Sequence, residues 1–162
     1  EAAHLFSCFP ILAMVLTPFL GYFLDRIGKG ATMLMGGSVI MIACHLSFAF
    51  LLPLVPSKAL ALTLIVILGV SFSLVPASLW PSVPKIIDEK ILGSAYCLIF
   101  WVQNIGLCLV PLLIGYLRQS TNGYLVPMIV FSLFGVLALA FSIFLKVEDK
   151  RKGYGLEEPN IK

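Results

Sequence analysis

Apolar and polar positions are segregated into long blocks along this chain. Five mostly apolar runs, separated by short polar segments, lie at about residues 3–23, 31–52, 59–80, 91–117 and 124–145. Each run is about 20 residues or longer, and a helix of that length rises about 1.5 Å per residue and crosses the roughly 30 Å hydrocarbon core of a bilayer. The runs lack the two-residue alternation of membrane β-strands. The pattern therefore predicts an all-α membrane protein with five transmembrane helices.

Proline and glycine residues mark where these helices bend, end or approach one another. Pro18 and Pro76 lie inside apolar runs, where we expect bends because proline leaves a backbone carbonyl without its partner. Pro81 and Pro84 are expected to close the third helix. Small residues in the second run should allow a close helix contact. They are Gly36, Gly37 and Ser38.

Composition and charge agree with a lipid environment. Hydrophobic residues make up 60% of the chain and charged residues only 12%, whereas charged residues make up about 25% of a soluble domain. The net charge of +3 lies between the apolar runs, without the interleaved basic and aromatic residues that grip nucleic acid. We therefore expect the lipid bilayer, and no nucleic acid, as a partner.

The chemically reactive residues do not suggest an enzyme, a cofactor or a metal site. All cysteines fall in apolar runs without a C-x-x-C pair, so we expect them to be small buried hydrophobes. They are Cys8, Cys44, Cys97 and Cys108. No phosphate-binding loop, H-E-x-x-H or G-x-S-x-G motif occurs. His45 lies inside the second run, where we favour packing or a partner contact over a proton relay.

Lysine and arginine residues are divided unequally between the two sides of the predicted bundle. Five spans place the loop at Asp25, the loop at Lys85 and the tail of residues 147–162 on one side. Basic residues favour the cytoplasmic side, so we expect a cytoplasmic, solvated tail and an outer or lumenal Glu1. The side with the tail carries Arg26, Lys29, Lys85, Lys90, Lys146, Lys150, Arg151, Lys152 and Lys162, and the other side carries Lys58 and Arg118.

The polar loop after the first run has a distinctive spacing, G-Y-F-L-D-R-I-G-K-G. Gly21 would permit close packing, and Gly28 would supply a turn with positive φ. Asp25 is expected to face the N-terminus of a neighbouring helix, where negative charge is favoured. Arg26 and Lys29 are expected to contact an anionic leaflet.

This loop resembles the cytoplasmic loop motif of the major facilitator superfamily, with a core of Gly-x-x-x-Asp-Arg-x-Gly. The matching residues are Gly21, Asp25, Arg26 and Gly28, whereas Gly30 stands where a second basic residue is usual. In that family the motif lies between helices two and three and again between helices eight and nine. It helps to hold the two halves together when the carrier is open outward. Four further runs and a basic tail follow here, so the resemblance implies helices eight to twelve of twelve.

Further positions are similar to the lysosomal dipeptide-transporter branch of that family and its bacterial relatives. They are Thr17-Pro18, Leu79-Trp80-Pro81, Leu92-Gly93-Ser94-Ala95-Tyr96, Gln103-Asn104-Ile105-Gly106 and Asn122-Gly123-Tyr124. This similarity implies a carrier that moves dipeptides through a central cavity. We expect it in a bacterial inner membrane, or in the lysosomal membrane if the source is eukaryotic.

The fourth run carries the main candidates for a substrate cavity. Tyr96, Phe100 and Gln103 share one helical face, and Asn104 lies about 80° further round. An amide in a membrane needs a hydrogen-bond partner, so the two amides either bind peptide-like groups of a substrate or join helices. By the resemblance this helix is the eleventh, which lines the cavity in the family.

The third run adds three candidates. Ser71 and Ser78 are seven positions apart and share a face, and Trp80 ends the predicted helix on the basic side. Trp80 is either an interfacial belt residue or part of a gate or cavity wall. No Asp, Glu, Lys or Arg lies deep in any run, so a proton-carrying carboxylate would have to lie elsewhere in the carrier.

Together these patterns predict that residues 1–146 form the C-terminal transmembrane bundle of a carrier working by alternating access. The chain begins without Met, and we expect an N-terminal half of the same carrier to precede it. A small-molecule substrate is the other expected partner, and the sequence leaves an accessory subunit open. Two alternatives remain: a carrier of another solute, such as a sugar or an organic anion, and a membrane subunit that transports nothing.

Overall fold

The computed structural model describes the backbone of residues 2–161 and the side chains of residues 11–161. The side chain of Cys8, and all of Glu1 and Lys162, lie outside the described residues. The described chain is built of helices and contains no strand, so the all-α prediction is confirmed. The elements are α1 (Ala2–Ile27), α2 (Gly30–Leu46), the π-helical turn η1 (Ser47–Leu51), α3 (Leu52–Leu54), α4 (Lys58–Ile86), the 3-10 turn η2 (Glu89–Ile91), α5 (Leu92–Thr121) and α6 (Leu125–Lys152).

Four stretches of the described chain are long and apolar enough to cross a membrane. They are Gly30–Leu54, Lys58–Ile86, Glu89–Thr121 and Leu125–Lys152, and they coincide with the second to fifth predicted spans. The first predicted span lies in α1, whose 26 residues extend about 39 Å. Within α1, the side chains of residues 2–10 are not among those described.

The prediction that Pro81 and Pro84 close the third helix is wrong, because α4 continues to Ile86. Proline at position 84 removes the amide that would bond the carbonyl four residues earlier, that of Trp80. The hydroxyl of Tyr96 on α5 donates to this carbonyl at 3.2 Å. A neighbouring helix thus satisfies the freed group, which is how proline is tolerated within membrane helices.

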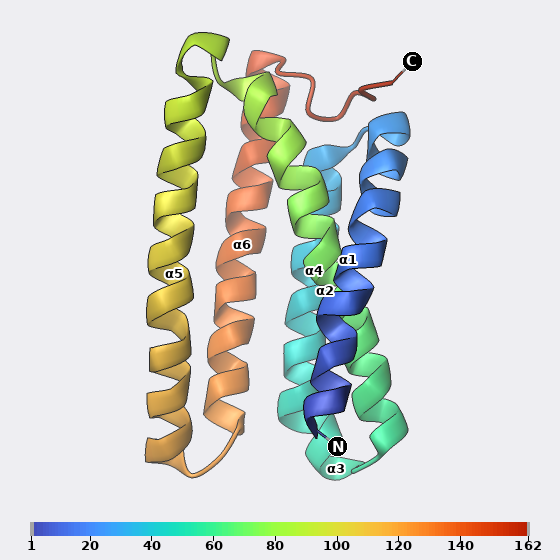
Figure 1. Cartoon of the computed structure of the whole chain (residues 1–162), viewed down its shortest axis with the longest axis vertical. Coiled ribbons are helices and arrows are strands. Elements are labelled where there is room, and N and C mark those ends of the chain that lie inside the picture. Colours follow the sequence, from blue (N-terminus) through green and yellow to red (C-terminus); the bar gives the residue numbers. More distant parts are fainter. Residues whose placement is uncertain (1, 162) are drawn as a thin grey trace.

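The C-terminal helix also extends beyond its predicted end. α6 continues to Lys152 and ends at Gly153, which adopts a left-handed conformation with φ 69°. The amide of Gly153 donates to the carbonyl of Asp149 at 2.7 Å, and Gly155 also has a positive φ of 74°. These two glycines reverse the chain, so that the last residues cross the end of the bundle (Figure 1).

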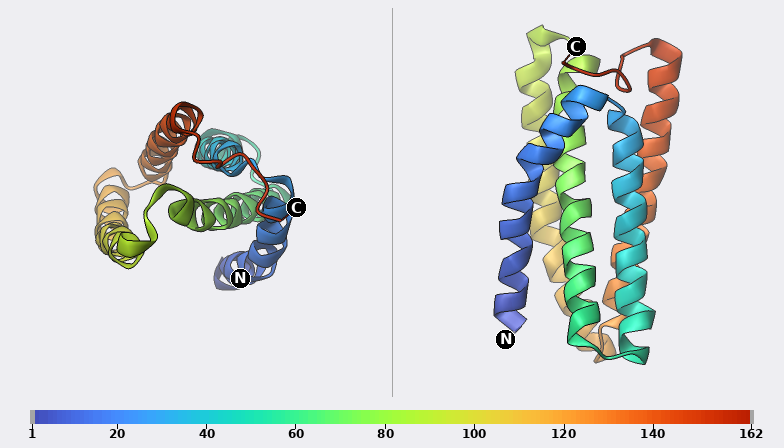
Figure 2. Two further views of the ribbon diagram at one scale, coloured as in Figure 1. Left: turned by 90° about the horizontal axis from the view of Figure 1, so that it is seen from above. Right: turned by 90° about the vertical axis from the view of Figure 1, so that its right-hand side faces the viewer.

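Helix α2 occupies a central place in the bundle, where it packs against α4 and α6, while α1 packs against α4 (Figure 2). Small residues permit these contacts, as predicted for Gly37. A Cβ atom at Gly37 would lie 3.5 Å from the Leu74 Cβ atom on α4, and one at Gly135 on α6 would lie 2.7 Å from Cγ1 of Ile42. No described atom lies within 4 Å of the corresponding position at Gly36.

Helix α5 is the least packed element, standing beside α6 at the edge of the bundle (Figure 1). None of its residues is buried. The expectation of buried cysteines is therefore wrong for Cys97 and Cys108, which are exposed on α5, although Cys44 on α2 is buried. In a membrane protein, such an apolar exposed surface faces lipid or another part of the assembly.

The two ends of the bundle differ in structure and charge. The α1–α2 turn, the α4–α5 connection and the C-terminal segment meet at one end, here called the basic end, and the α5–α6 loop and α3 lie at the other (Figure 1). The basic residues predicted to share a side therefore do lie at the same end, apart from Lys162, which is outside the described residues.

Candidate functional site

The α1–α2 loop is a tight turn at the basic end. Gly28 has φ 75°, as predicted for the turn glycine, and Lys29 has a left-handed φ of 62°. A Cβ atom at Gly28 would lie 2.6 Å from the backbone oxygen of Glu157, so only glycine fits without a shift. The close packing expected at Gly21 is not found, because nothing in the described residues lies within 4 Å of its Cβ position.

Within the described residues the hydrogen bonds of Asp25 are made to the C-terminal tail, so the expected contact with the N-terminus of a neighbouring helix stays a prediction. Its carboxylate oxygen Oδ1 accepts a 2.7 Å hydrogen bond from Nδ2 of Asn160, and its carbonyl accepts from the amides of Asn160 and Ile161 at 2.8 and 2.9 Å. The carboxylate at the start of α2 belongs instead to Glu157, whose Oε1 accepts from the amide of Thr32 at 2.9 Å. Sequence analysis missed Glu157, since its spacing from α2 carries no local signal.

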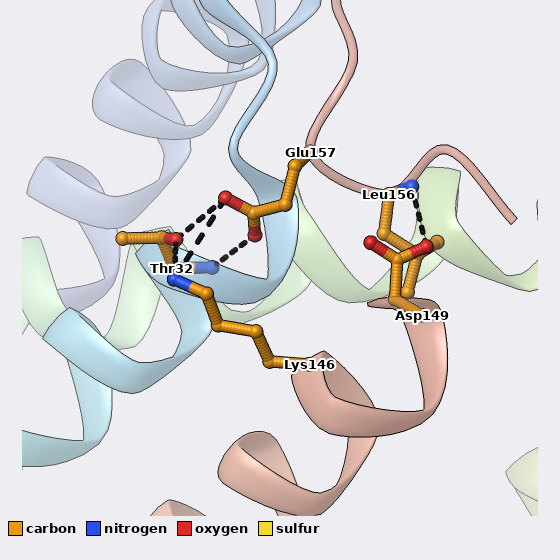
Figure 3. A network of polar contacts seen from close by, with 5 residues as sticks. All are labelled: Thr32, Lys146, Asp149, Leu156 and Glu157. Atoms are coloured by element: carbon orange, nitrogen blue, oxygen red, sulfur yellow. Dashed lines mark hydrogen bonds and ion pairs between the residues drawn. The ribbon is translucent and has the colours of Figure 1, made fainter. Parts of the chain in front are cut away.

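The carboxylate of Glu157 joins three elements of the fold (Figure 3). The hydroxyl of Thr32 on α2 donates to Glu157 Oε2 at 2.6 Å and accepts a 2.5 Å hydrogen bond from Nζ of Lys146 on α6. Lys146 Nζ also lies 3.9 Å from Glu157 Oε2. Negative charge at a helix N-terminus is favourable, and the nearby ammonium adds to this stabilisation.

The prediction of a solvated C-terminal tail holds only in part, because residues 150–153 and 158–161 are exposed but the tail is also docked on the basic end. Leu156 is only 2% exposed, and its amide donates to Oδ1 of the buried Asp149 at 3.0 Å. Its carbonyl accepts from the amide of Gly30 at 2.9 Å. Lys85 on α4 donates from Nζ to two carbonyls of the tail, at 2.9 and 3.2 Å. The high charge of the tail suggested solvation, but the side chain of Leu156 and the backbone groups of the tail find partners in the bundle.

The basic residues of the loop lie on the outer surface of this end. Arg26 and Lys29 are both exposed. The Arg26 guanidinium lies over the ring of Tyr22, 4.9 Å from its centroid. This placement leaves both residues accessible to an anionic leaflet, and that contact stays a prediction.

Three of the predicted cavity residues form an aromatic cluster between α4 and α5. The rings of Trp80 and Phe100 stack with centroids 4.9 Å apart, and the ring of Tyr96 lies 6.0 Å from that of Trp80. The Tyr96 hydroxyl bonds the Trp80 carbonyl, as described above. Trp80 thus contacts α5 and is not an isolated residue at the membrane–water interface. The cluster holds α4 and α5 together near the basic end.

The two amides of α5 lie beyond this cluster, toward the middle of the helix. Both Gln103 and Asn104 are exposed, and Nδ2 of Asn104 donates to the carbonyl of Phe100 on its own helix at 2.7 Å. Within the described residues, no hydrogen bond joins either amide to another helix. The helix-joining alternative therefore gains no support inside this bundle.

The two serines of α4 face α2 and not the aromatic cluster. Ser71 is buried and donates to the carbonyl of Gly37 at 2.6 Å. Ser78 is also buried, and of the buried side-chain polar atoms in the described chain, its Oγ is the one without a hydrogen-bond partner. Ser78 lines a small cavity under the tail. The structure therefore does not bring these serines together with Gln103 and Asn104.

The remaining polar residue within the spans is His45. It is buried on α2 with its ring packed against Phe131 of α6, at a centroid distance of 5.1 Å, and its Nδ1 lies 2.8 Å from the carbonyl of Met41. These contacts agree with the packing interpretation. Within the part of the chain that the structure describes, no group of three or more His, Cys, Asp or Glu residues could hold a metal ion.

Comparison with known families and proteins gives a consistent result. A sequence profile described as the Major Facilitator Superfamily matches residues 1–160. The lysosomal dipeptide transporter MFSD1 of Gallus gallus is 30% identical over 145 residues, which covers 90% of this chain and 31% of that protein. The protein of the same name from Danio rerio is 30% identical over 156 residues, covering 96% and 32% respectively. That from Homo sapiens is 27% identical over 146 residues, covering 90% and 30%.

These matches confirm the resemblance that the loop motif indicated. The relatives are named as transporters and none as an enzyme, which agrees with the absence of catalytic motifs. The chain spans about a third of the length of the curated relatives it matches. No solved structure matches the chain significantly.

Proposed function

Because this chain belongs to the Major Facilitator Superfamily, whose profile matches residues 1–160, we propose that it forms the C-terminal part of a solute transporter working by alternating access. Two bundles of helices would rock about a site near the middle of the membrane. The exposed, apolar α5 and the exposed face of α1 supply surface that a second bundle could cover. An N-terminal half of the same carrier is the proposed partner.

The proposed substrates are dipeptides or similar small organic solutes, moved by secondary active or facilitative transport. The observation that carries this proposal is the 30% identity, over 90% of this chain, to a protein named as a dipeptide transporter. The exposed amides of Gln103 and Asn104 support it, because a side-chain amide can bond the amide group of a peptide. The cluster of Trp80, Tyr96 and Phe100 would form the wall of the cavity nearest the basic end.

The charged ends of a dipeptide require partners that the spans of this chain do not carry. No Asp, Glu, Lys or Arg lies deep in the apolar runs. Those partners, and any proton-carrying group, would therefore belong to the N-terminal half. We further propose that the basic end is cytoplasmic, following the distribution of Lys and Arg. The membrane would be a bacterial inner membrane or, in a eukaryote, the lysosomal membrane.

Uptake by proteoliposomes that contain the full-length carrier tests this function. We expect a labelled dipeptide to accumulate or equilibrate faster than in liposomes without protein, and an excess of unlabelled dipeptide to compete. A labelled sugar and a labelled organic anion serve as the alternative substrates. Uptake of one of these, without competition by dipeptide, would replace the substrate class. No uptake of any of them by folded carrier would favour a subunit that transports nothing.

A further inference from the structure

The C-terminal residues 155–161 form a compact unit with the α1–α2 loop, here called the tail clasp. The amide of Lys29 donates to the carbonyl of Glu157 at 3.1 Å. The next amide, that of Gly30, donates to the carbonyl of Leu156 at 2.9 Å. Amides at the start of a helix have no partner within that helix, so the clasp caps α2 with groups from the far end of the chain.

Two side chains of the clasp act on different parts of the loop. Glu157 holds the first turn of α2 through Thr32, and its charge is balanced by Lys146. Asn160 holds the carboxylate and the carbonyl of Asp25 at the end of α1. The clasp therefore determines the relative placement of the two helix ends that the loop connects. It also determines which way the carboxylate of the loop motif points.

The clasp is held mainly by hydrogen bonds over an imperfectly filled space. Leu156 is its one buried apolar side chain. Beneath it lies a cavity of about 20 Å³, large enough for one water molecule, which Ser78 lines with its unpaired hydroxyl. The clasp thus buries little apolar surface, and little apolar surface is lost when it opens. Segments with few apolar contacts open locally at a small fraction of the global unfolding free energy.

We propose that the tail clasp is a releasable part of the loop motif, with Glu157 and Asn160 as positioning residues. When docked, it holds Asp25 and the start of α2 in the geometry seen here. When released, it frees Asp25 for other partners, which changes the rate at which the carrier switches between its two open states. The docking claim stands on the contacts above, whereas the switching claim rests on the proposed transport function.

Hydrogen exchange of the full-length carrier in nanodiscs tests the docking claim. Glu157→Gln and Asn160→Ala should each speed exchange about tenfold in peptides covering residues 29–33 and 154–161, the effect of losing one hydrogen bond to a charged group. Glu158→Gln is the matched control. The Glu158 residue is exposed, and it accepts the hydrogen bond from Lys85 with its backbone carbonyl, which the substitution keeps. Unchanged exchange in both test variants, or an equal effect of the control, would overturn the clasp.

Transport kinetics of the same variants test the switching claim. If Asn160 acts through Asp25, Asn160→Ala should change the maximal rate about threefold or more and leave KM and the melting temperature nearly unchanged, because in the described chain Asn160 bonds Asp25 and none of the proposed cavity residues. A purely structural role would lower the melting temperature and leave the rate of the folded carrier unchanged.

Exchanging the two partners gives a stricter test. Asn160→Asp alone places two carboxylates side by side and should mimic Asn160→Ala. Adding Asp25→Asn again pairs an amide donor with a carboxylate acceptor, so the double variant should recover most of the exchange protection. A double variant with no more exchange protection than Asn160→Asp would refute the positioning role. Failure of the wild-type carrier to move any tested solute would end the proposed function and the switching claim, while hydrogen exchange would still decide whether the clasp forms.

Discussion

The hydroxyl of Ser71 on α4 donates a 2.6 Å hydrogen bond to the backbone carbonyl of Gly37 on α2. Ser71 is only 1% exposed, and a Cβ atom at Gly37 would lie 3.5 Å from the carbonyl oxygen of Ser71. The small glycine lets the helices approach, and the serine uses that approach to bond across them. Such pairings of small and hydroxyl residues stabilise membrane helix packing.

Replacing this hydroxyl should weaken the bundle. We expect Ser71→Ala to lower the free energy of unfolding by about 0.5–1.5 kcal/mol, the range of interhelical hydrogen bonds in membranes. Ser73→Ala is the control, because Ser73 is equally buried but its hydroxyl donates to the carbonyl of Gly69 on the same helix. That hydrogen bond does not join two helices. Reversible unfolding in bicelles measures the free energy of unfolding of both variants. An equal decrease in the free energy of unfolding of the two variants would show that the hydrogen bond to Gly37 does not stabilise the bundle more than a bond within one helix.

The turn glycine should tolerate no side chain. Gly28→Ala introduces a left-handed alanine, at a cost of about 1–2 kcal/mol, and also a clash with the backbone of Glu157. Gly153→Ala carries the same backbone cost without the clash, since φ is 69° there and no atom of the described residues lies within 4 Å of the Cβ position. We therefore expect Gly28→Ala to be the more destabilising and to speed exchange in the tail. Similar melting temperatures and tail protection in the two variants would contradict the tight docking at Gly28.

The amides of α5 should affect substrate binding more than stability. Gln103→Leu or Asn104→Leu should raise the apparent dissociation constant for a dipeptide about tenfold, which corresponds to about 1.4 kcal/mol for one hydrogen bond. Leucine is close in size to both side chains, so little packing is lost. Binding and thermal unfolding are measured on the same purified variants. Unchanged affinity would remove these residues from the site, and lower stability would assign them to helix packing against another part of the carrier.

The basic end should face the cytoplasm. A reporter fused after Lys162 is expected to be active only in its cytoplasmic form, because Lys and Arg cluster at that end. A second reporter, placed in the loop near Asn122, should show the opposite location, since this loop lies at the other end of the bundle (Figure 1). The reverse pattern would invert the orientation and remove the loop motif from the cytoplasmic side.

The sequence was sufficient where the determining information is local. Hydropathy located the apolar runs that became α2, α4, α5 and α6, because burying a helix in lipid needs a continuous apolar stretch of fixed length. The identity of Gly28 predicted its positive φ, since few other residues adopt that conformation readily. Trp80 and Tyr96 were both assigned to one cavity, but the sequence did not predict the hydrogen bond between the Tyr96 hydroxyl and the Trp80 carbonyl.

Only the tertiary structure decided which distant groups meet. The helix-initiating carboxylate proved to be Glu157, 125 positions from Thr32, and Asp25 proved to bond Asn160, 135 positions away. Pro84 did not end α4, because the hydroxyl of Tyr96 reaches the carbonyl that proline frees. Hydropathy and helical period describe the environment of each residue along one helix. They carry no information on which polar group of another segment will satisfy a freed amide or carbonyl, and that is settled when the helices pack.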